Sequence, residues 1–285
     1  MKKRAVSVML TAAMVSAMLA GCGSKNAETQ SAADTTAESA ASGDETSADT
    51  QAADAETTDA ETTDASKTDG TFTVGFDQDF PPMGFVGDDG EFTGFDLEMA
   101  AEVAKRLNLM IAYQPIAWDA KDMELDAGTI DCIWNGFTMN GREDDYEWSK
   151  PYMKNNQVFV VRGDSDINSE ADLAGKNVEV QTDSSAEAAL NDNSELTSTF
   201  GSLTPVADYN TAFMDLESGA VDAIAMDDVV ASYQITSRKA DFKVLDDVIA
   251  AEEYGIGFKK GNTGLRDKVQ ATLEEMAADG TAAKI

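Results

Sequence analysis

Histidine is absent from the 285 residues of this chain, and with it the commonest general base and the commonest metal ligand of proteins. Basic residues are also scarce: 21 Lys and Arg stand against 53 Asp and Glu, for a formal net charge of −32 at pH 7. Nucleic-acid binding needs a basic surface that displaces counterions, so this composition argues against it. The acidity is typical of a soluble surface whose charges repel one another. We therefore expect no metal site, no cofactor and no nucleic-acid partner.

Large apolar side chains are absent from residues 23–70, which sets this segment apart from the rest of the chain. It contains no Val, Ile, Leu, Met, Phe, Trp or Tyr, and it carries twelve acidic residues against two lysines. Residues 54–66 are nearly a repeat, DAETT-DAETT-DAS. A segment with no apolar surface to bury cannot offset the entropy lost on ordering, and like charges extend it. We predict a disordered acidic tether, with a partner-binding tail as the alternative.

The N-terminus has the pattern of a secretory signal. Three basic residues at 2–4 precede a stretch of small and apolar residues, 5–20, which is too short and too rich in Ala and Ser for a membrane-spanning helix. The stretch ends in Leu-Ala-Gly-Cys at 19–22, which resembles the lipobox of bacterial lipoproteins. The alternative is an ordinary signal peptide followed by a chance cysteine.

The chain has only two cysteines, and the N-terminal pattern assigns a role to the first of them. We predict that residues 1–21 are a lipoprotein signal peptide and that residues 22–69 comprise a lipidated Cys22 and the tether. The lipid would hold the protein on the extracytoplasmic face of the bacterial cell membrane. Cys132 then has no partner for an intrachain disulfide, and its apolar neighbours predict a buried side chain rather than a nucleophile.

Strand signals alternate with helix signals over residues 70–285, which predicts an α/β architecture. The first helix is expected after Gly94, with Asp96 as its N-cap and an apolar face at helical spacing. The other elements expected in the first half are strands at 71–76, 109–114 and 130–134 and a helix near 119–127.

An internal echo predicts two similar lobes. Residues 125–135 (LDAGTIDCIWN) match residues 216–226 (LESGAVDAIAM), and each match is a helix end, a glycine, a short turn and a buried strand. Each copy closes a block that a similar strand opens, at 72–76 and 177–181. We interpret the blocks as two βαβ-type lobes.

Two further apolar runs, 157–162 and 254–258, are interpreted as extended crossings between the lobes. Two such crossings would form a hinge beside a cleft that closes on its ligand. The alternative is that both runs are ordinary core strands. Ligands of such sheets bind beyond the carboxyl ends of the strands. The positions expected there are Asp77, Trp118, residues 135–138, residues 182–185 and Asp227.

The chain resembles the polar amino acid-binding proteins of ABC importers, the extracellular solute-binding proteins of family 3. The likeness spans roughly residues 70–285, and its strongest part is DCIWNGFTMNGR at 131–142 followed by WSKPY at 148–152. The supporting stretches, in the same order as in the family, are GFDL at 94–97, DLAGKNV at 172–178, VQTDSSAE at 180–187, DAIAMD at 222–227 and YGIGFKK at 254–260.

The resemblance implies a type II periplasmic-binding-protein-like fold, with two βαβ-type lobes joined by a two-stranded hinge. Lobe 1 is expected to comprise residues 70–160 and 255–285, and lobe 2 residues 161–254. The implied function is that of an extracytoplasmic binding subunit, a monomer without catalysis, which closes on a free amino acid and delivers it to the permease subunits of an ABC importer.

A free amino acid is a zwitterion, so its site needs donors for a carboxylate and an acceptor for an ammonium. Arg142 can offer a bidentate, charge-assisted fork to the carboxylate. By the resemblance, Gly136 and Thr138 add donors from the same lobe. Asp227 accepts from the ammonium. Ser184 and Ser185 contribute from the other lobe.

Aromatic rings are expected against the aliphatic part of the ligand. Phe80 and Trp118 match positions where members of the family hold such rings, and core packing is the alternative for both. Asp77 follows the first strand and, by the resemblance, reaches the ligand side chain.

Two departures from the family pattern concern the pocket. The loop between Thr138 and Arg142 is one residue shorter than usual, and Asp183 stands where a glycine is usual. Together with Asp77 and Asp227, Asp183 favours a cationic ligand such as lysine or arginine.

Two other functions are open to the same fold. An extracytoplasmic dehydratase could use a cleft carboxylate as acid or base, although the absence of histidine and the complete amino acid-binding pattern count against it. A detached sensor module would require a receptor or kinase segment.

Overall fold

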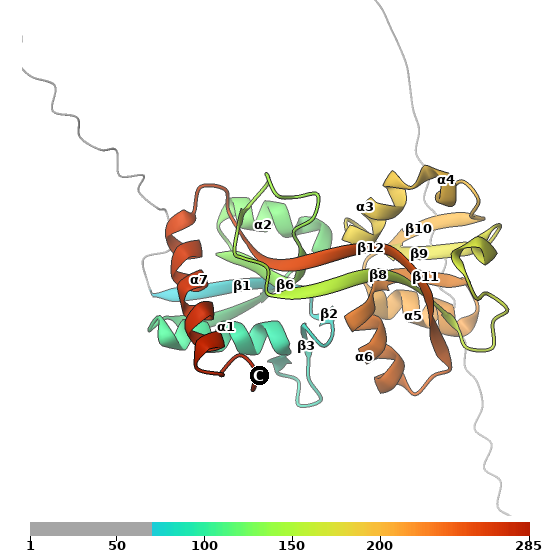
Figure 1. Cartoon of the computed structure of the whole chain (residues 1–285). Helices are drawn as coiled ribbons and strands as arrows, with labels where there is room; N and C mark the ends of the chain where they lie inside the picture. The colour runs from blue at the N-terminus through green and yellow to red at the C-terminus, as the bar shows by residue number, and fades with distance from the viewer. Residues whose placement is uncertain (1–69) are drawn as a thin grey trace, which may run out of the picture. The chain divides into compact units, whose positions relative to one another are not determined.

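The computed structural model describes residues 70–285, which form two lobes (Figure 1). The predicted signal peptide, the lipidated Cys22 and the tether lie outside the described residues. Within 70–285, no helix is long and apolar enough to cross a membrane.

Lobe 1 is built on the parallel pairing of β1 with β5 on one side and with β6 on the other. The helix α1 covers this sheet with the apolar face predicted from its spacing, and Leu97, Ala100 and Val103 pack against the alternate residues Phe72, Val74 and Phe76 of β1. The elements of lobe 1 are β1 (Thr71–Phe76), β2 (Asp79–Phe80), β3 (Gly84–Val86), β4 (Phe92–Thr93), α1 (Phe95–Arg106), β5 (Met110–Pro115), η1 (Trp118–Ala120), α2 (Lys121–Ala127), β6 (Cys132–Thr138), β7 (Glu147–Trp148) and α7 (Thr263–Ala278).

Lobe 2 repeats the arrangement, because β9 pairs in parallel with β10 and β11. Helix α5 closes one face of this sheet through buried Phe213 and Leu216, and α3 closes the other through Ala186 and Leu190. The elements of this lobe are η2 (Glu170–Leu173), β9 (Asn177–Gln181), α3 (Ser185–Asp192), α4 (Ser194–Thr197), β10 (Ser202–Val206), α5 (Tyr209–Ser218), β11 (Ala223–Asp227) and α6 (Asp228–Arg238).

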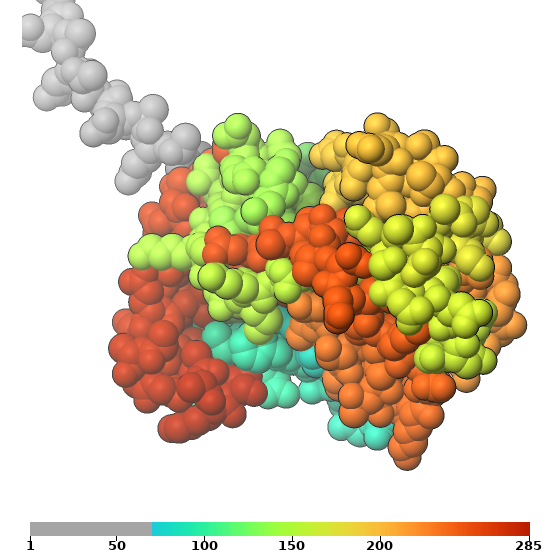
Figure 2. All heavy atoms as spheres, turned by 45° about the vertical axis from the view of Figure 1, so that its right-hand side comes forward, coloured from blue at the N-terminus to red at the C-terminus, as the bar shows by residue number. Residues whose placement is uncertain are grey.

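Two long strands join the lobes, β8 (Met153–Arg162) and β12 (Phe242–Phe258), and both are antiparallel to their neighbours. Strand β8 pairs with β11 of lobe 2, and the last residues of β12 pair with β6 of lobe 1. The strand order is therefore β10-β9-β11-β8-β12-β6-β1-β5. In Figure 2, the orange-red residues of β12 cross the visible face between the lobes. The expected two-lobed α/β fold with a two-stranded hinge is confirmed.

The internal echo corresponds to the same local structure in both lobes. Helix α2 ends at Gly128 with a φ of 71°, and α5 ends at Gly219 with a φ of 80°. This left-handed conformation is unfavourable for residues with a Cβ, which explains the glycine in both copies. Each glycine leads into a buried central strand, β6 or β11.

Two predictions of local structure were wrong. Strand β6 does not end at residue 134 but continues to Thr138, because its last residues pair with β12, a contact that spacing along the chain does not reveal. Asp96 is not the N-cap of α1, since Gly94 occupies that position and the Asp96 side chain is buried. Cys132 is buried, as predicted, and it forms no disulfide within residues 70–285.

Candidate functional site

The hinge strands bring polar side chains together where the two lobes meet. Successive residues of a strand point to opposite sides, so Asn155 and Gln157 share one face of β8, while Glu252 and Tyr254 share one face of β12. Members of this group also come from the ends of the two echoed strands. We define the floor cluster as Thr138, Asn155, Gln157, Asp227, Glu252 and Tyr254, all of which are buried.

Asp227 is the acidic acceptor of this cluster, at the C-terminal end of β11. One of its oxygens, Oδ1, accepts hydrogen bonds from Asn155 Nδ2 at 2.8 Å, Gln157 Nε2 at 2.8 Å and the Tyr254 hydroxyl at 2.5 Å. Burial raises the pKa of Asp227 well above its usual value, and the nearby charge of Glu252 raises it further.

Glu252 is the second carboxylate of the floor cluster. Its Oε1 accepts from the same two amides, Asn155 at 2.6 Å and Gln157 at 2.7 Å, and from the Thr138 hydroxyl at 2.9 Å. Ser185 of lobe 2 joins the network, because its hydroxyl lies 3.1 Å from Thr138 Oγ1 and accepts from Gln157 Nε2 at 3.0 Å. The network therefore links the two lobes through side chains.

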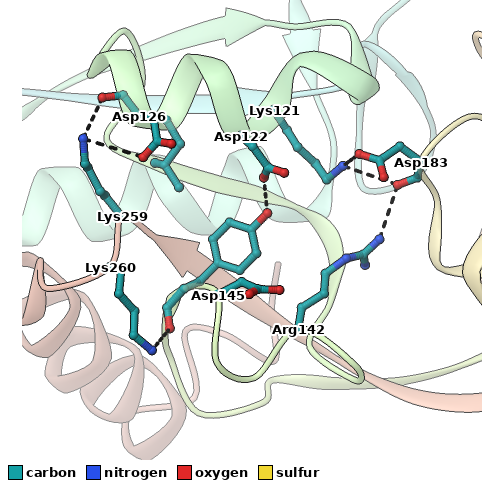
Figure 3. A pocket seen from close by; sticks show the side chains of 10 residues that line it. Lys121, Asp122, Asp126, Arg142, Asp145, Asp183, Lys259 and Lys260 are labelled. Atoms are coloured by element: carbon teal, nitrogen blue, oxygen red, sulfur yellow. Dashed lines mark hydrogen bonds and ion pairs between the residues drawn. The ribbon is translucent and has the colours of Figure 1, made fainter.

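Arg142 lies at the rim of a cavity between the lobes that Ser185 and Glu252 also line. Its guanidinium donates to the carbonyl oxygens of Thr138 and Asp183, both at 3.3 Å, and it lies over the Phe137 ring at 5.4 Å. Figure 3 shows Arg142 and Lys121 both directed at Asp183. These three residues line a cavity of about 410 Å³.

Lys121 is a buried cation whose partner comes from the other lobe. Its side chain is only 1% exposed, and its ammonium pairs with the Asp183 carboxylate. It also lies 5.2 Å from the centre of the Trp118 ring. Asp183 adopts a left-handed φ of 58°. A glycine would adopt this conformation without strain, whereas in this chain an aspartate adopts it.

A second cavity, of about 500 Å³, lies between the lobes near the end of β1 and is lined by Asp77, Trp118 and Thr182, among others. Asp77 accepts from Gln181 Nε2 of lobe 2 at 2.6 Å and from the Asp79 amide at 2.8 Å. Burial raises the pKa of Asp77 to about 6.

The two expected aromatic residues differ in their surroundings. Phe80 packs against the Tyr209 ring of lobe 2, with ring centres 6.1 Å apart, and belongs to the core cluster of that lobe. Trp118 packs edge-on against Phe137, with ring centres 5.5 Å apart, and also lines the cavity beside Asp77.

Two expected site residues are engaged within the protein. The Gly136 N–H donates to Asp96 Oδ2 at 2.6 Å, and the Ser184 hydroxyl caps α3 by accepting from the Glu187 amide at 3.1 Å. Ligand contacts by these groups stay predictions, as do those of the other expected site residues.

Sequence reasoning missed four members of the floor cluster, namely Asn155, Gln157, Glu252 and Tyr254, and it missed the rim residue Lys121. The sequence did carry a signal for the amides, because β8 has a run of four polar residues, 154–157, directly before its apolar residues, 158–161. Glu252 gave a weaker signal, since it stands in a run of exposed and half-buried residues of β12.

Comparison with known proteins identifies relatives of this chain. The family of bacterial extracellular solute-binding proteins, family 3, matches residues 72–285. The L-cystine-binding protein TcyJ of Escherichia coli (strain K12) is 32% identical over 214 residues, covering 74% of this chain and 79% of that protein.

Solved structures give the same result. A substrate-binding protein of an ABC uptake transporter from Streptococcus pneumoniae, with bound histidine, has a TM-score of 0.72 and 33% identity, covering 74% of this chain and 88% of that chain. An ancestral arginine-binding protein bound to arginine has a TM-score of 0.70 and 34% identity, covering 75% of this chain and 96% of that chain.

Proposed function

This chain belongs to the bacterial extracellular solute-binding proteins of family 3, and we propose on this basis that it is the amino acid-binding subunit of an ABC importer. The proposal is supported by relatives whose names describe binding of cystine, histidine or arginine. The dehydratase alternative has no such support, since the family is one of binding proteins.

The observation that carries the proposal is the buried Asp227 carboxylate at the junction of the lobes. Its hydrogen-bond partners are amides and a hydroxyl, and within residues 70–285 it makes no ion pair with Lys or Arg. A buried carboxylate with only neutral partners is costly and gains from a cation. The α-ammonium of an amino acid is such a cation.

The lobe junction also provides donors for the carboxylate of the amino acid. Arg142 at the rim can turn from the carbonyl oxygens that it now contacts to the stronger acceptor that a ligand carboxylate offers. Thr138 and Ser185, which approach each other across the lobes, can donate to the same carboxylate. Asp77, Phe80, Trp118, Gly136 and Ser184 would line the remainder of the ligand. Cleft closure about β8 and β12 would then bury the ligand between the lobes.

A ligand screen by thermal unfolding tests this function. A true ligand raises the melting temperature by an amount that grows with its concentration relative to Kd. We expect one or a few of the common amino acids to do so, and we expect the response to be lost in Arg142→Ala and in Asp227→Asn. Lys105→Ala, which removes an exposed cation from the last turn of α1, is the control. The proposal fails if no amino acid stabilises the protein, and the site fails if both site variants respond like the wild type.

We also propose that Cys22 carries a lipid that anchors the protein at the extracytoplasmic face of the cell membrane. The support is the Leu-Ala-Gly-Cys sequence at 19–22 after a basic and apolar leader. In a bacterium that processes lipoproteins, Cys22→Ser should move the protein from the membrane fraction to a soluble one and abolish labelling by radioactive palmitate. Cys132→Ser should stay at the membrane. Retention of labelled Cys22→Ser protein would refute the anchor.

A further inference from the structure

Two buried carboxylates share the floor cluster. Asn155 Nδ2 and Gln157 Nε2 each donate both to Asp227 Oδ1 and to Glu252 Oε1, at 2.6–2.8 Å in all four cases. The two acidic oxygens are therefore close neighbours. Asp227 is 4% exposed and Glu252 is 5% exposed, so water screens little of their mutual repulsion.

The donors that hold this pair are all neutral. They are the two amides, the Tyr254 hydroxyl on Asp227, and the Thr138 and Ser185 hydroxyls on Glu252. Within residues 70–285, no Lys or Arg forms an ion pair with either carboxylate. A third buried carboxylate, Asp77, opens on the cavity between the lobes and is likewise held by neutral groups. Two basic groups at the lobe junction, Arg142 and Lys121, are directed at Asp183.

A neutral amino acid does not balance this arrangement. Its carboxylate takes up the positive charge of Arg142, and its single ammonium compensates one of the two floor carboxylates. The other must then remain a buried charge without a cation or take up a proton, and both cost free energy. A ligand with a second ammonium or guanidinium compensates both carboxylates at once.

We propose that Glu252 is a specificity-determining residue of the binding site. With Asp227 it selects amino acids that carry a second cationic group besides the α-ammonium, either a side-chain ammonium or guanidinium or the second α-ammonium of a dimeric amino acid. This inference rests on the proposed function of the cleft and names its class of ligand.

A purely structural role for Glu252 makes a different prediction. Its hydrogen bonds to Thr138, Asn155 and Gln157 could hold the hinge strands together, and a glutamine would serve that purpose with the same acceptor oxygen and nearly the same volume. A carboxylate in place of the amide gains nothing unless a positive charge enters the site. Replacing Glu252 by glutamine therefore separates the two roles.

The test is calorimetric titration of the full chain and its variants with two matched pairs of ligands. L-arginine is compared with L-citrulline, which has the same shape but no side-chain charge. L-cystine is compared with the mixed disulfide of L-cysteine and 3-mercaptopropionate, which lacks the second ammonium. We expect the wild type to prefer the cationic member of at least one pair by about tenfold or more, equivalent to about 1.4 kcal/mol.

Glu252→Gln should weaken binding of that cationic ligand by about tenfold or more and leave its neutral partner unchanged or tighter, so that the preference disappears. Glu253→Gln is the matched control, because Glu253 is the next residue of β12 and its side chain is exposed. It should leave both affinities unchanged. Glu252→Asp retains the charge and should keep the preference with weaker overall binding. Thermal unfolding of each ligand-free variant verifies the fold.

The outcomes separate this inference from the proposed function. If the wild type binds neutral ligands as tightly as cationic ones, or if Glu252→Gln weakens both members of a pair equally, Glu252 does not select the second charge, although the protein still binds amino acids. If the wild type binds no amino acid of either kind, the proposed function and this inference fail together.

Discussion

Asp96 illustrates how one buried acid can position part of the site without facing the ligand. Its Oδ2 accepts from the Gly136 amide at 2.6 Å and from the Tyr152 hydroxyl at 2.8 Å, and its side chain is fully buried. It thereby fixes β6 just before Thr138 joins the floor cluster. The other oxygen, Oδ1, has no hydrogen-bond partner among the described residues. Burial raises the pKa of Asp96 to about 7.

This raised pKa predicts a pH-dependent stability. Between about pH 4, the ordinary pKa of an aspartate, and pH 7 the folded protein keeps a proton that the unfolded chain has lost, so the contribution of Asp96 falls as pH rises through this window. Asp96→Asn removes the titration. Its stability relative to wild type should therefore improve from pH 4 to pH 8, by at most on the order of 4 kcal/mol. Denaturant unfolding at both pH values measures the difference.

Asp88→Asn is the control for net charge, since it removes an exposed acid from the same lobe. An equal change in the free energy of unfolding at pH 4 and at pH 8 on Asp96→Asn would contradict this pH dependence. Such a result would mean that the Asp96 carboxyl stays charged, or stays neutral, over the whole range.

Single residues were easier to predict from the sequence than their partners. Four of the positions expected after the strands, Asp77, Trp118, Ser185 and Asp227, lie at the lobe junction, because strand ends converge at one edge of a parallel sheet. Their contacts with a ligand stay predictions. The sequence could not reveal that two amides and a second acid converge on Asp227. That convergence depends on the pairing of β8 with both β11 and β12, which no local pattern specifies.

The helices and strands were also predictable where local sequence determines them and not where distant pairing does. The echoed helix–glycine–strand units were predictable because a left-handed glycine and an apolar run are local signals. The end of β6 was not, because residues 135–138 extend the strand only through pairing with β12, more than 110 residues later in the chain. The hinge strands show both effects, since their apolar parts were visible in the sequence and their full lengths were not.

The two lobes lie in contact through polar groups as well as through the apolar cluster in which Phe80 and Met83 of lobe 1 join Tyr209 of lobe 2. Besides the floor cluster, Gln181 of lobe 2 donates to Asp77 of lobe 1, and Asn210 of lobe 2 donates to Asp79 at 2.7 Å. Hydrogen bonds of this kind exchange readily with water, so each contributes little net free energy. Among the polar contacts between the lobes, the Lys121–Asp183 pair is the one that holds a buried cation, because Lys121 is only 1% exposed.

Replacing Asp183 by asparagine should shift the ligand-free protein toward an open arrangement of the lobes. The substitution removes the charge that pairs with buried Lys121 but suits the φ of 58°, because asparagine tolerates the left-handed region. With fewer molecules closed, the apparent affinity for a ligand falls by the same factor as the closed fraction, about several-fold. Small-angle X-ray scattering of the ligand-free protein should give a larger radius of gyration, and saturating ligand should restore the wild-type value. Asp166→Asn, an exposed change in lobe 2, should alter neither quantity. If Asp183→Asn scatters like the wild type without ligand, the Lys121–Asp183 pair does not control closure.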